Sequence, residues 1–316
     1  MAEKYMKTIK FETDGDIYHP LPLLGGGGKS WTQSNGANGA FNKVYYANGL
    51  WVACADSKGL WYSEDGKVWT QSNVTLDRFY SVYYGNGLWV AGSYYTGLYY
   101  STDGKVWTQI NITSDTFDSV YYNNDIWVAG SSTGLYYSTD GKNWTQSNVT
   151  SGAFKSVYYG NGIWVAGGSG SGLYYSTDGK SWTQSNNNSD NFYSVYYSND
   201  LWVAGGGSVG IWYSTDGKVW TQSNITSGWF NFAYSSNGLW VAVSSAGIYY
   251  STDGKSWTLS NITSGWFSSI YYSNDIWVAC CGSGLYYSEV TEGRILQVVN
   301  GEWAMVAVPN AEEVAY

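Results

Sequence analysis

Aspartates are the residues of this sequence whose spacing most suggests chemistry. Six of them recur in a Ser-x-Asp-Gly-x-x-Trp tract, of which residues 101–107 are a typical copy. They are Asp65, Asp103, Asp140, Asp178, Asp216 and Asp253. In tight turns, Asp and Ser side chains accept hydrogen bonds from backbone N–H groups, and glycine adopts the positive φ that such turns need. We therefore interpret these carboxylates as structural groups of a turn rather than as general acids and bases.

The aspartates outside the tract are the other candidates for catalysis, because hydrolysis of a glycosidic bond needs two carboxylates that flank it. They are Asp56, Asp77, Asp115, Asp118, Asp125, Asp190, Asp200 and Asp275. Three of them fill a turn position that holds glycine in other copies, and three more share one loop position in different copies. Carboxylates distributed in this way would stand apart from one another. We predict that the chain is not an enzyme and that it has no catalytic residue and no cofactor.

Other reactive or charged residues are scarce. The 316 residues include 15 Lys and Arg, 24 Asp and Glu and a single His, which gives a net charge of −9. This balance disfavours a nucleic-acid-binding protein, which would carry a basic stripe. No run of about 18 apolar residues predicts a transmembrane helix, and the N-terminus lacks the apolar core of a signal peptide. The three cysteines, Cys54, Cys280 and Cys281, form no metal-binding pattern, and we expect free thiols.

The aspartate tract belongs to a longer repeat that fills most of the chain. Its tryptophans are 37 or 38 residues apart, and each copy also holds a Trp-Val-Ala segment. In one copy, β-rich segments at 119–122, 126–129, 135–138 and 144–147 are separated by turn residues. Asn-Gly and Asp-Gly between β-branched and aromatic runs are strong hairpin signals, and no helical period is present. Each copy is therefore predicted to form four antiparallel strands, which is one blade of a β-propeller.

The offset between the first and last copies predicts how the blades close into a ring. The first copy begins with a lone fourth strand at 31–34, whereas the last copy ends after its third strand at 285–288. Pairing of these two strands would leave no open edge. Seven Trp-Val-Ala segments then predict an all-β, seven-bladed β-propeller over residues 29–288, closed by the N-terminal strand. An open β-solenoid is the alternative architecture, and the offset argues against it.

The recurring tract resembles the Asp-box, or bacterial neuraminidase repeat, of sialidase-like propellers, with one residue fewer between Asp and Gly. The resemblance implies structural boxes whose tryptophans fill the gaps between blades. A sialidase-like site would also need three arginines that clamp the substrate carboxylate, and a glutamate beside a tyrosine nucleophile. The predicted ring holds one arginine, Arg78, and one glutamate, Glu64, which lies inside a box. The resemblance therefore does not extend to catalysis.

One loop of the repeat matches the N-glycosylation pattern. The Asn-x-Thr copies of this loop begin at Asn73, Asn111, Asn148, Asn224 and Asn261. They arise from repetition of a single loop, and the sequence shows no signal peptide. We therefore expect these asparagines to carry no glycan.

Residues 1–28 and 289–316 lie outside the repeat and are predicted to be attachment segments. Apolar runs at 295–299 and 302–306 flank Asn300-Gly301, which predicts a β-hairpin that must pack on something else. The Leu-Gln-Val-Val-Asn-Gly-x-Trp run and a short N-terminal strand resemble the flanks of bacteriophage tail and fibre proteins. That resemblance implies a location on a virion or extracellular surface. The flanks would then attach to other virion proteins and display the propeller.

The copies differ mainly at one edge of the predicted blades. The strand order places the Asn-Gly turns and the boxes at one edge, and the Ser-Asn-x-Thr-Ser and Gly-rich loops at the other. At this second edge the residue before a repeated Phe is Ala40, Arg78, Thr116, Ala153, Asn191, Trp229 or Trp266. Paired exposed tryptophans suit stacking on sugar rings, so we predict a carbohydrate platform of Trp229 and Trp266, supported by Asn231. The second predicted patch consists of Tyr94, Tyr95 and Arg78.

These features predict a non-catalytic binding protein that recognises a surface glycan or a cell-surface receptor, as a receptor-binding or decoration protein of a phage or bacterial surface. The alternative is a structural or protein–protein interaction propeller without a small ligand. Clustered exposed aromatic side chains on the variable edge would favour the first. We expect no nucleic-acid partner and no membrane insertion, and a homo-oligomer is compatible with the sequence.

Overall fold

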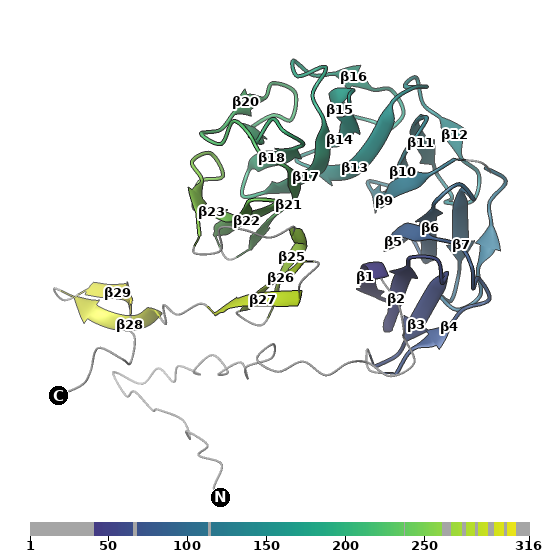
Figure 1. Cartoon of the computed structure of the whole chain (residues 1–316), viewed down its shortest axis with the longest axis horizontal. Coiled ribbons are helices and arrows are strands. Elements are labelled where there is room, and N and C mark those ends of the chain that lie inside the picture. The colour runs from purple at the N-terminus through teal and green to yellow at the C-terminus, as the bar shows by residue number, and fades with distance from the viewer. Residues whose placement is uncertain are drawn as a thin grey trace, which may run out of the picture. The chain divides into compact units, whose positions relative to one another are not determined.

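Every regular element described in the computed structural model is a β-strand. The structure describes residues 41–260, except 66, 67, 113, 114 and 237, and the backbone of five later strands between residues 267 and 307. Residues 41–260 form six antiparallel sheets of four strands, each sheet in simple chain order (Figure 1). None of the described residues belongs to a helix long and apolar enough to cross a membrane. The predicted all-β fold of repeated four-stranded units is confirmed.

The strands of the six sheets have closely similar lengths in every copy. The first two sheets contain β1 (Phe41–Ala47), β2 (Leu50–Ala55), β3 (Leu60–Ser63), β4 (Thr70–Gln71), β5 (Phe79–Gly85), β6 (Leu88–Ser93), β7 (Leu98–Ser101) and β8 (Thr108–Gln109). The next two contain β9 (Phe117–Asn123), β10 (Ile126–Ser131), β11 (Gly134–Ser138), β12 (Thr145–Gln146), β13 (Ala153–Gly160), β14 (Ile163–Ser169), β15 (Gly172–Ser176) and β16 (Thr183–Gln184). The last two contain β17 (Phe192–Ser198), β18 (Leu201–Gly206), β19 (Ile211–Ser214), β20 (Thr221–Gln222), β21 (Phe230–Ser236), β22 (Leu239–Ser244), β23 (Gly247–Ser251) and β24 (Thr258–Leu259).

The turn between the first two strands of each sheet has the conformation that its residues predict. Asn86 and Gly87 between β5 and β6 have φ values of 48° and 75°. Asn124 and Asp125 between β9 and β10 have φ values of 48° and 59°. Positive φ at both central residues is typical of the type I′ turn, whose twist matches that of the flanking strands. Asp125 and Asp200, which replace glycine at this position, are therefore turn residues, as predicted, whereas Asp275 lies outside the described residues.

The fourth strand of each sheet is shorter than the sequence suggested. It covers Thr145–Gln146 in the third sheet, where residues 144–147 were expected. In the fourth sheet, the backbone N–H and C=O of Trp182 bond to the side chain of Asn148 from the preceding sheet. The box tryptophan of the fourth sheet thus makes its backbone bonds to the preceding sheet, and β16 begins one residue after it. No such bond joins Asn111 to Trp144, both among the described residues, in the third sheet, whose fourth strand is equally short.

The hydrophobic core lies between neighbouring sheets rather than within one sheet. Leu50 and Val52 of the first sheet cluster with Phe79, Trp89 and Trp107 of the second, and all five are buried. The same type of cluster recurs at the later junctions. Strands alternate their side chains between two faces, so a sheet with apolar residues on both faces must be covered on both. The repeat therefore stabilises itself only by stacking copies.

The first strand of each of the six sheets contributes one tyrosine to a continuous row. These first strands lie on the inner side of the six sheets in Figure 1. Neighbouring ring centroids in this row are 4.5–5.1 Å apart. The row consists of Tyr45, Tyr83, Tyr121, Tyr158, Tyr196 and Tyr234. Burial raises the pKa of Tyr121 well above its ordinary value, and the neighbouring phenol groups of Tyr158 and Tyr83 raise it further. The Tyr121 phenol is therefore a neutral packing group.

The face of the first sheet differs from its equivalents in the other five. Phe41 and Val44 on β1 are 36% and 51% exposed, whereas their counterparts Phe79 and Val82 on β5 are 0% exposed. In every later sheet, the preceding sheet covers this face of the first strand. No sheet precedes the first one in the described part of the chain. An apolar face of this kind is costly to leave in water.

A seventh sheet and a hairpin complete the described strands. The seventh sheet has three strands, β25 (Phe267–Ser273), β26 (Ile276–Cys281) and β27 (Gly284–Glu289). The predicted C-terminal hairpin is present as β28 (Arg294–Val299) and β29 (Glu302–Ala307), with Val298 opposite Trp303. Six sheets, not the seven predicted blades, have four strands in the described part of the chain. The expected closing strand at 31–34 lies outside the described residues, so the seventh full blade and the closed ring stay predictions.

Candidate functional site

The six sheets present two edges with different chemistry. The box edge, as we call it, holds the turns between first and second strands and the Ser-x-Asp-Gly boxes. The loop edge holds the loops between second and third strands and those that lead to the next sheet. The two kinds of loop contact each other at this edge. The Leu60 N–H donates to the Val74 carbonyl, and the Tyr94 N–H donates to the Arg78 carbonyl at 2.8 Å. The predicted distribution of turns and loops between the two edges is therefore present.

Each box uses its carboxylate to organise its own backbone. The Ser101 hydroxyl donates to Asp103 Oδ1 at 2.9 Å, and the N–H groups of Lys105 and Val106 donate to the same oxygen at 2.8 and 2.9 Å. The Gly104 N–H donates to the Ser101 hydroxyl. Burial alone would raise the pKa of Asp103, but these donors outweigh it and hold that pKa below its ordinary value. A carboxylate held ionised in this way is a poor proton donor or acceptor at neutral pH.

The boxes also fasten neighbouring sheets to each other. Asn73 Nδ2 donates to the Trp107 carbonyl at 2.9 Å, and the Trp107 N–H donates to Asn73 Oδ1 at 2.8 Å. Asn148, Asn186 and Asn224 contact the next box tryptophan in the same manner. Three of these four asparagines begin an N-glycosylation pattern. Their amide groups are therefore committed to contacts between sheets.

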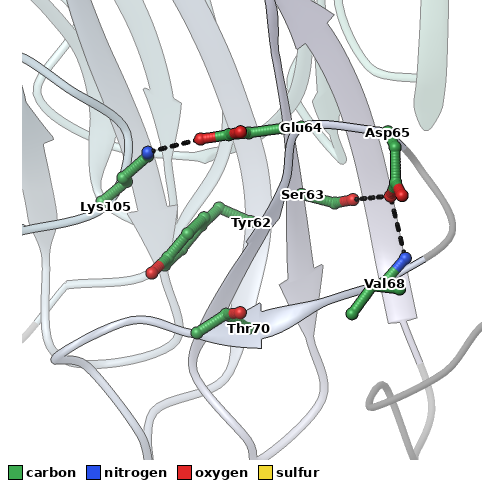
Figure 2. Close-up of a pocket in the computed structure, with 7 residues that line it drawn as sticks. All are labelled: Tyr62, Ser63, Glu64, Asp65, Val68, Thr70 and Lys105. Carbon is green, nitrogen blue, oxygen red and sulfur yellow. Dashed lines mark hydrogen bonds and ion pairs between the residues drawn. The ribbon is translucent and has the colours of Figure 1, made fainter.

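A second repeated contact joins a box lysine to the preceding sheet. Figure 2 shows a hollow at the first two sheets, where Lys105 reaches across to Glu64 and Tyr62. Lys105 Nζ lies 2.8 Å from Glu64 Oε1 and 5.5 Å from the centroid of the Tyr62 ring. The lysines of four further boxes lie over the equivalent tyrosines at 5.1–5.8 Å. The hollow is thus one instance of a repeated junction rather than a distinctive site.

The loop edge brings together all three members of the second predicted patch. The Arg78 guanidinium forms an ion pair with Asp56 and lies 5.3 Å from the centroid of the Tyr94 ring. Tyr94 and Tyr95 have ring centroids 4.1 Å apart, and Tyr80 packs edge-on against Tyr94. A side-chain hydrogen bond with Tyr80, together with the charge of Asp56, raises the pKa of Arg78 above its ordinary value. We call this group of five residues the Arg78 cluster.

The first predicted patch is only partly within the described residues. Trp229 is 44% exposed and stacks on Tyr193 of the preceding sheet, with ring centroids 5.7 Å apart and an interplanar angle of 19°. Gly207 makes room for this stack, because a Cβ atom there would lie 2.4 Å from the Tyr193 ring. Trp266, its expected partner, lies outside the described residues. The aromatic neighbour of Trp229 that the structure describes is Tyr193, which sequence reasoning had not selected.

The two patches occupy the same position of the repeat. Arg78 and Trp229 both precede the repeated Phe, and both reach back to the first residue of a loop on the preceding sheet. Arg78 pairs with Asp56, whereas Trp229 forms a β-bridge with Gly207. At another junction this position holds Asn191, which hydrogen-bonds Ser169. One backbone arrangement therefore presents different side chains at each junction of the loop edge.

The remaining carboxylates have structural partners. Buried Asp115 accepts hydrogen bonds from the hydroxyls of Ser132 and Thr133. Asp118 pairs with Lys155 at 2.9 Å, and the Asp77 carboxylate accepts from the Tyr99 hydroxyl at 2.6 Å. Asp77 and Asp115, which share one loop position, belong to different sheets, as predicted. Asp118 is a neighbour of Asp115: burial raises the pKa of Asp118, and the charge of Asp115 raises it further. Cys54 is a buried free thiol, and burial raises its pKa to about 12. Across the described ranges, no three His, Cys, Asp or Glu side chains are placed to hold a metal ion.

The sequence did not predict three residues of these two sites as binding residues: Asp56 and Tyr80 of the Arg78 cluster, and Tyr193 beneath Trp229. From the sequence, Asp56 is only a candidate catalytic carboxylate, and no role is predicted for Tyr80 or Tyr193. Tyr80 and Tyr193 directly follow a repeated Phe, where other copies hold Asn42, Asp118 and Lys155. Each sheet carries a β-bulge next to this position, for example between Phe79 and Ser81. Variation at the residue after the Phe was therefore a usable signal.

Comparison with known proteins identifies the architecture. No protein-family model matches the chain, and no curated protein is significantly similar to it in sequence. Among solved structures, the designed protein Ika8 has a TM-score of 0.66 at 9% identity, covering 81% of this chain and 86% of its own. YCF48 bound to a D1 peptide has a TM-score of 0.60 at 16% identity, with 80% and 92% covered. The extracellular domain of BT4673 from B. thetaiotaomicron has a TM-score of 0.63 at 13% identity, with 84% and 40% covered. YCF48 and BT4673 are β-propeller proteins, so the chain shares the β-propeller fold.

Proposed function

We propose that this chain is a non-catalytic binding propeller that recognises glycans through its loop edge. The observation that carries the proposal is the stack of Trp229 on Tyr193, which leaves 44% of the tryptophan exposed. A flat aromatic surface complements the C–H face of a sugar ring, and its exposure would otherwise be unfavourable. The stack also fixes the orientation of the tryptophan, which lowers the entropic cost of binding.

The contrast between the two edges supports this assignment. The exposed apolar side chains of the boxes are aliphatic, as in Val68, Val106 and Val219. The loop edge presents the exposed aromatic side chains Tyr94, Tyr95 and Trp229 at positions that differ between copies. The exposed Tyr46 and Tyr250 lie near the box edge, at positions that hold tyrosine in most copies. Aromatic rings supply a large contact area with few rotatable bonds, which suits them to recognition. The loop edge is therefore the better candidate for a ligand surface.

We also propose that the propeller has seven blades and is closed by its N-terminal strand. The exposed face of β1, with Phe41 and Val44, has the composition of a face that every later sheet buries. The three-stranded seventh sheet, completed by residues 31–34, would cover this face and fill its own fourth position. Deletion of residues 1–34 is then expected to abolish cooperative thermal unfolding. A truncated protein that melts like the full chain would contradict closure.

The setting that we propose is a virion or another extracellular surface. Segments 1–28 and 289–316, which resemble the flanks of phage tail and fibre proteins, would attach the propeller to other virion proteins. The ligand would be a surface glycan or a glycosylated cell-surface receptor. Extracellular propellers of this fold exist, as the BT4673 domain illustrates.

A peptide is the second candidate ligand. The solved structure of YCF48 with a D1 peptide shows that a protein of this fold binds a peptide. Exposed tyrosine and tryptophan are also enriched at protein interfaces. A protein-interaction propeller would still bind an immobilised cell-surface receptor after enzymatic removal of the receptor's glycans, whereas a glycan-binding propeller would not.

The glycan proposal is tested with an array of immobilised oligosaccharides and the full chain. The double variant Trp229→Ala with Trp266→Ala should lose at least about tenfold in affinity, or roughly 1.4 kcal/mol, for the glycans that the wild type binds. Its melting temperature should remain within a few degrees of wild type. Leu76→Ala is the matched control, because Leu76 is a largely exposed apolar side chain of the same edge. Undiminished binding by the double variant would exclude the tryptophan platform.

A further inference from the structure

The Arg78 cluster contains a backbone conformation that its side chain disfavours. Tyr95 has a φ of 63°, in the left-handed region that large side chains rarely adopt. The equivalent loop positions hold Ser57, Gly170 and Ser208, with φ values of 71°, 70° and 75°. The loop geometry is thus common to four sheets, but only the second places an aromatic ring there. A strained residue that smaller ones could replace indicates a role outside folding.

The strained loop is held firmly in place. The Tyr95 N–H donates to the Thr116 hydroxyl of the next sheet, and the Tyr94 N–H donates to the Arg78 carbonyl. The Ser93 hydroxyl donates to the Gly97 carbonyl at 2.7 Å and contacts the Thr96 hydroxyl. Tyr95 nevertheless remains 59% exposed. Its ring is therefore presented to solvent on a fixed backbone, as a preorganised contact surface.

The charges beside Tyr95 balance each other. Arg78 and Asp56 form an ion pair whose side chains are each more than a third exposed. A carboxylate or sulfate ligand would have to compete with Asp56 for the guanidinium and would meet a protein of net charge −9. An uncharged ligand with adjacent hydroxyls meets no such penalty. Guanidinium N–H groups donate to hydroxyl oxygens, and a carboxylate accepts from hydroxyl hydrogens, so the pair offers both halves of a diol contact.

We propose that the Arg78 cluster is a second sugar subsite, separate from Trp229, that selects uncharged sugars with vicinal hydroxyls. Tyr95 supplies the stacking surface, Arg78 donates to one hydroxyl and Asp56 accepts from its neighbour. Tyr94, packed beneath the guanidinium, holds Arg78 in position. The proposal rests on the proposed glycan-binding function and adds to it the class of sugar that one site accepts.

The test uses the full chain on an array that carries neutral hexose oligosaccharides and oligogalacturonates of matched length. Wild type should bind neutral sugars at least tenfold more tightly than the uronates. Tyr95→Asn should reduce neutral-sugar binding at least fivefold without lowering the melting temperature, because Asn tolerates a positive φ. Asp56→Asn should raise the affinity for uronates relative to neutral sugars, because it leaves the guanidinium without its carboxylate. Gly170→Asn, at the equivalent loop position of the fourth sheet, is the matched control and should leave both affinities unchanged.

The outcomes separate this proposal from the one on which it rests. Sugar binding that is lost with Trp229→Ala but unchanged in Tyr95→Asn and Asp56→Asn would overturn the second subsite and leave glycan recognition standing. A wild type that prefers uronates would overturn the assigned sugar class. Absence of binding to every sugar on the array would overturn both proposals. Lower neutral-sugar affinity in Tyr95→Asn at unchanged melting temperature, together with the altered preference of Asp56→Asn, would support the subsite.

Discussion

The box edge and the loop edge are built from the same 38-residue repeat but follow opposite rules. At the box edge, the lysine–tyrosine contact recurs at all five described junctions and the asparagine–tryptophan contact at four of them. At the loop edge, the residue before the repeated Phe changes from Arg78 to Thr116, Asn191 and Trp229, and several neighbouring rings remain exposed. The comparison indicates that the boxes stabilise the scaffold, while the loop edge varies freely because the scaffold does not depend on it.

The sharpest test of this division is the removal of a box tryptophan. Trp220 is 2% exposed and packs among Ile163, Val165 and Trp202 at one junction. Trp220→Ala should lower the free energy of unfolding by about 3–5 kcal/mol, because it leaves a large cavity. Urea denaturation measures this loss. Trp229→Ala is the control of the same chemistry at the loop edge and should cost less than about 2 kcal/mol, because Trp229 is only partly buried and its stack on Tyr193 contributes about 0.5–1.5 kcal/mol. Equal losses in the two variants would remove the distinction between the edges.

The asparagine contact between sheets should have the next largest effect. Asn148 makes two hydrogen bonds to the backbone of Trp182. Asn148→Ala should cost about 1–2 kcal/mol, since each such bond contributes roughly 0.5–1.5 kcal/mol. Thermal unfolding and urea unfolding both measure this loss of stability. Asn188→Ala, at an exposed asparagine on the loop edge, should be neutral. If the two variants were equally stable, the repeated amide contact would have no role in joining sheets.

The box carboxylates predict a dependence of stability on pH. Hydrogen bonds from backbone N–H groups lower the pKa of Asp253, and burial only partly opposes them. A carboxyl group whose pKa is lower in the folded state stabilises the protein above its unfolded pKa, near 3.9. That contribution is lost as the pH falls through the folded pKa. The melting temperature should therefore be steady above about pH 5 and fall below about pH 4. Asp253→Asn should make the fall shallower, and an unchanged slope would count against this carboxylate.

The lysine–tyrosine contact between sheets should have the smallest effect. Lys180 Nζ lies 5.8 Å from the centroid of the Tyr137 ring of the preceding sheet. Exposed pairs of this kind contribute about 0.5–1 kcal/mol. A double-mutant cycle of Lys180→Gln and Tyr137→Leu isolates the coupling from the loss of packing. A coupling energy indistinguishable from zero would show that the repeated lysine serves solubility rather than junctions between sheets.

Several features of the fold followed from local residue patterns. The turn at Asn86-Gly87, the hairpin around residues 300–301 and the alternation of four short strands are all decided by residues near one another in the chain. The box hydrogen bonds at Asp103 are equally local, since donor and acceptor lie within three residues. The gathering of Arg78, Tyr94 and Tyr95 was also predictable, because loops at the same edge of adjacent sheets must meet.

Contacts between sheets were not predictable in the same way. The stack of Trp229 on Tyr193 and the role of Asn148 depend on how far one sheet is shifted and rotated against the next. That geometry results from packing of tryptophans such as Trp202 and Trp240 across the junction. The sequence around Asn148 cannot show whether this asparagine carries a glycan or makes a packing contact. Only the position of the neighbouring Trp182 separates them.

The sequence alone determined the strands and the turns, because these depend on backbone preferences and on alternation within about ten residues. The tertiary structure decided which side chains of different copies meet, that Tyr95 stands in a left-handed conformation, and that Arg78 is neutralised by Asp56. Those outcomes depend on the relative placement of two sheets, which no single copy encodes. The same separation explains why the repeat predicts its scaffold well and its ligand surface only in part.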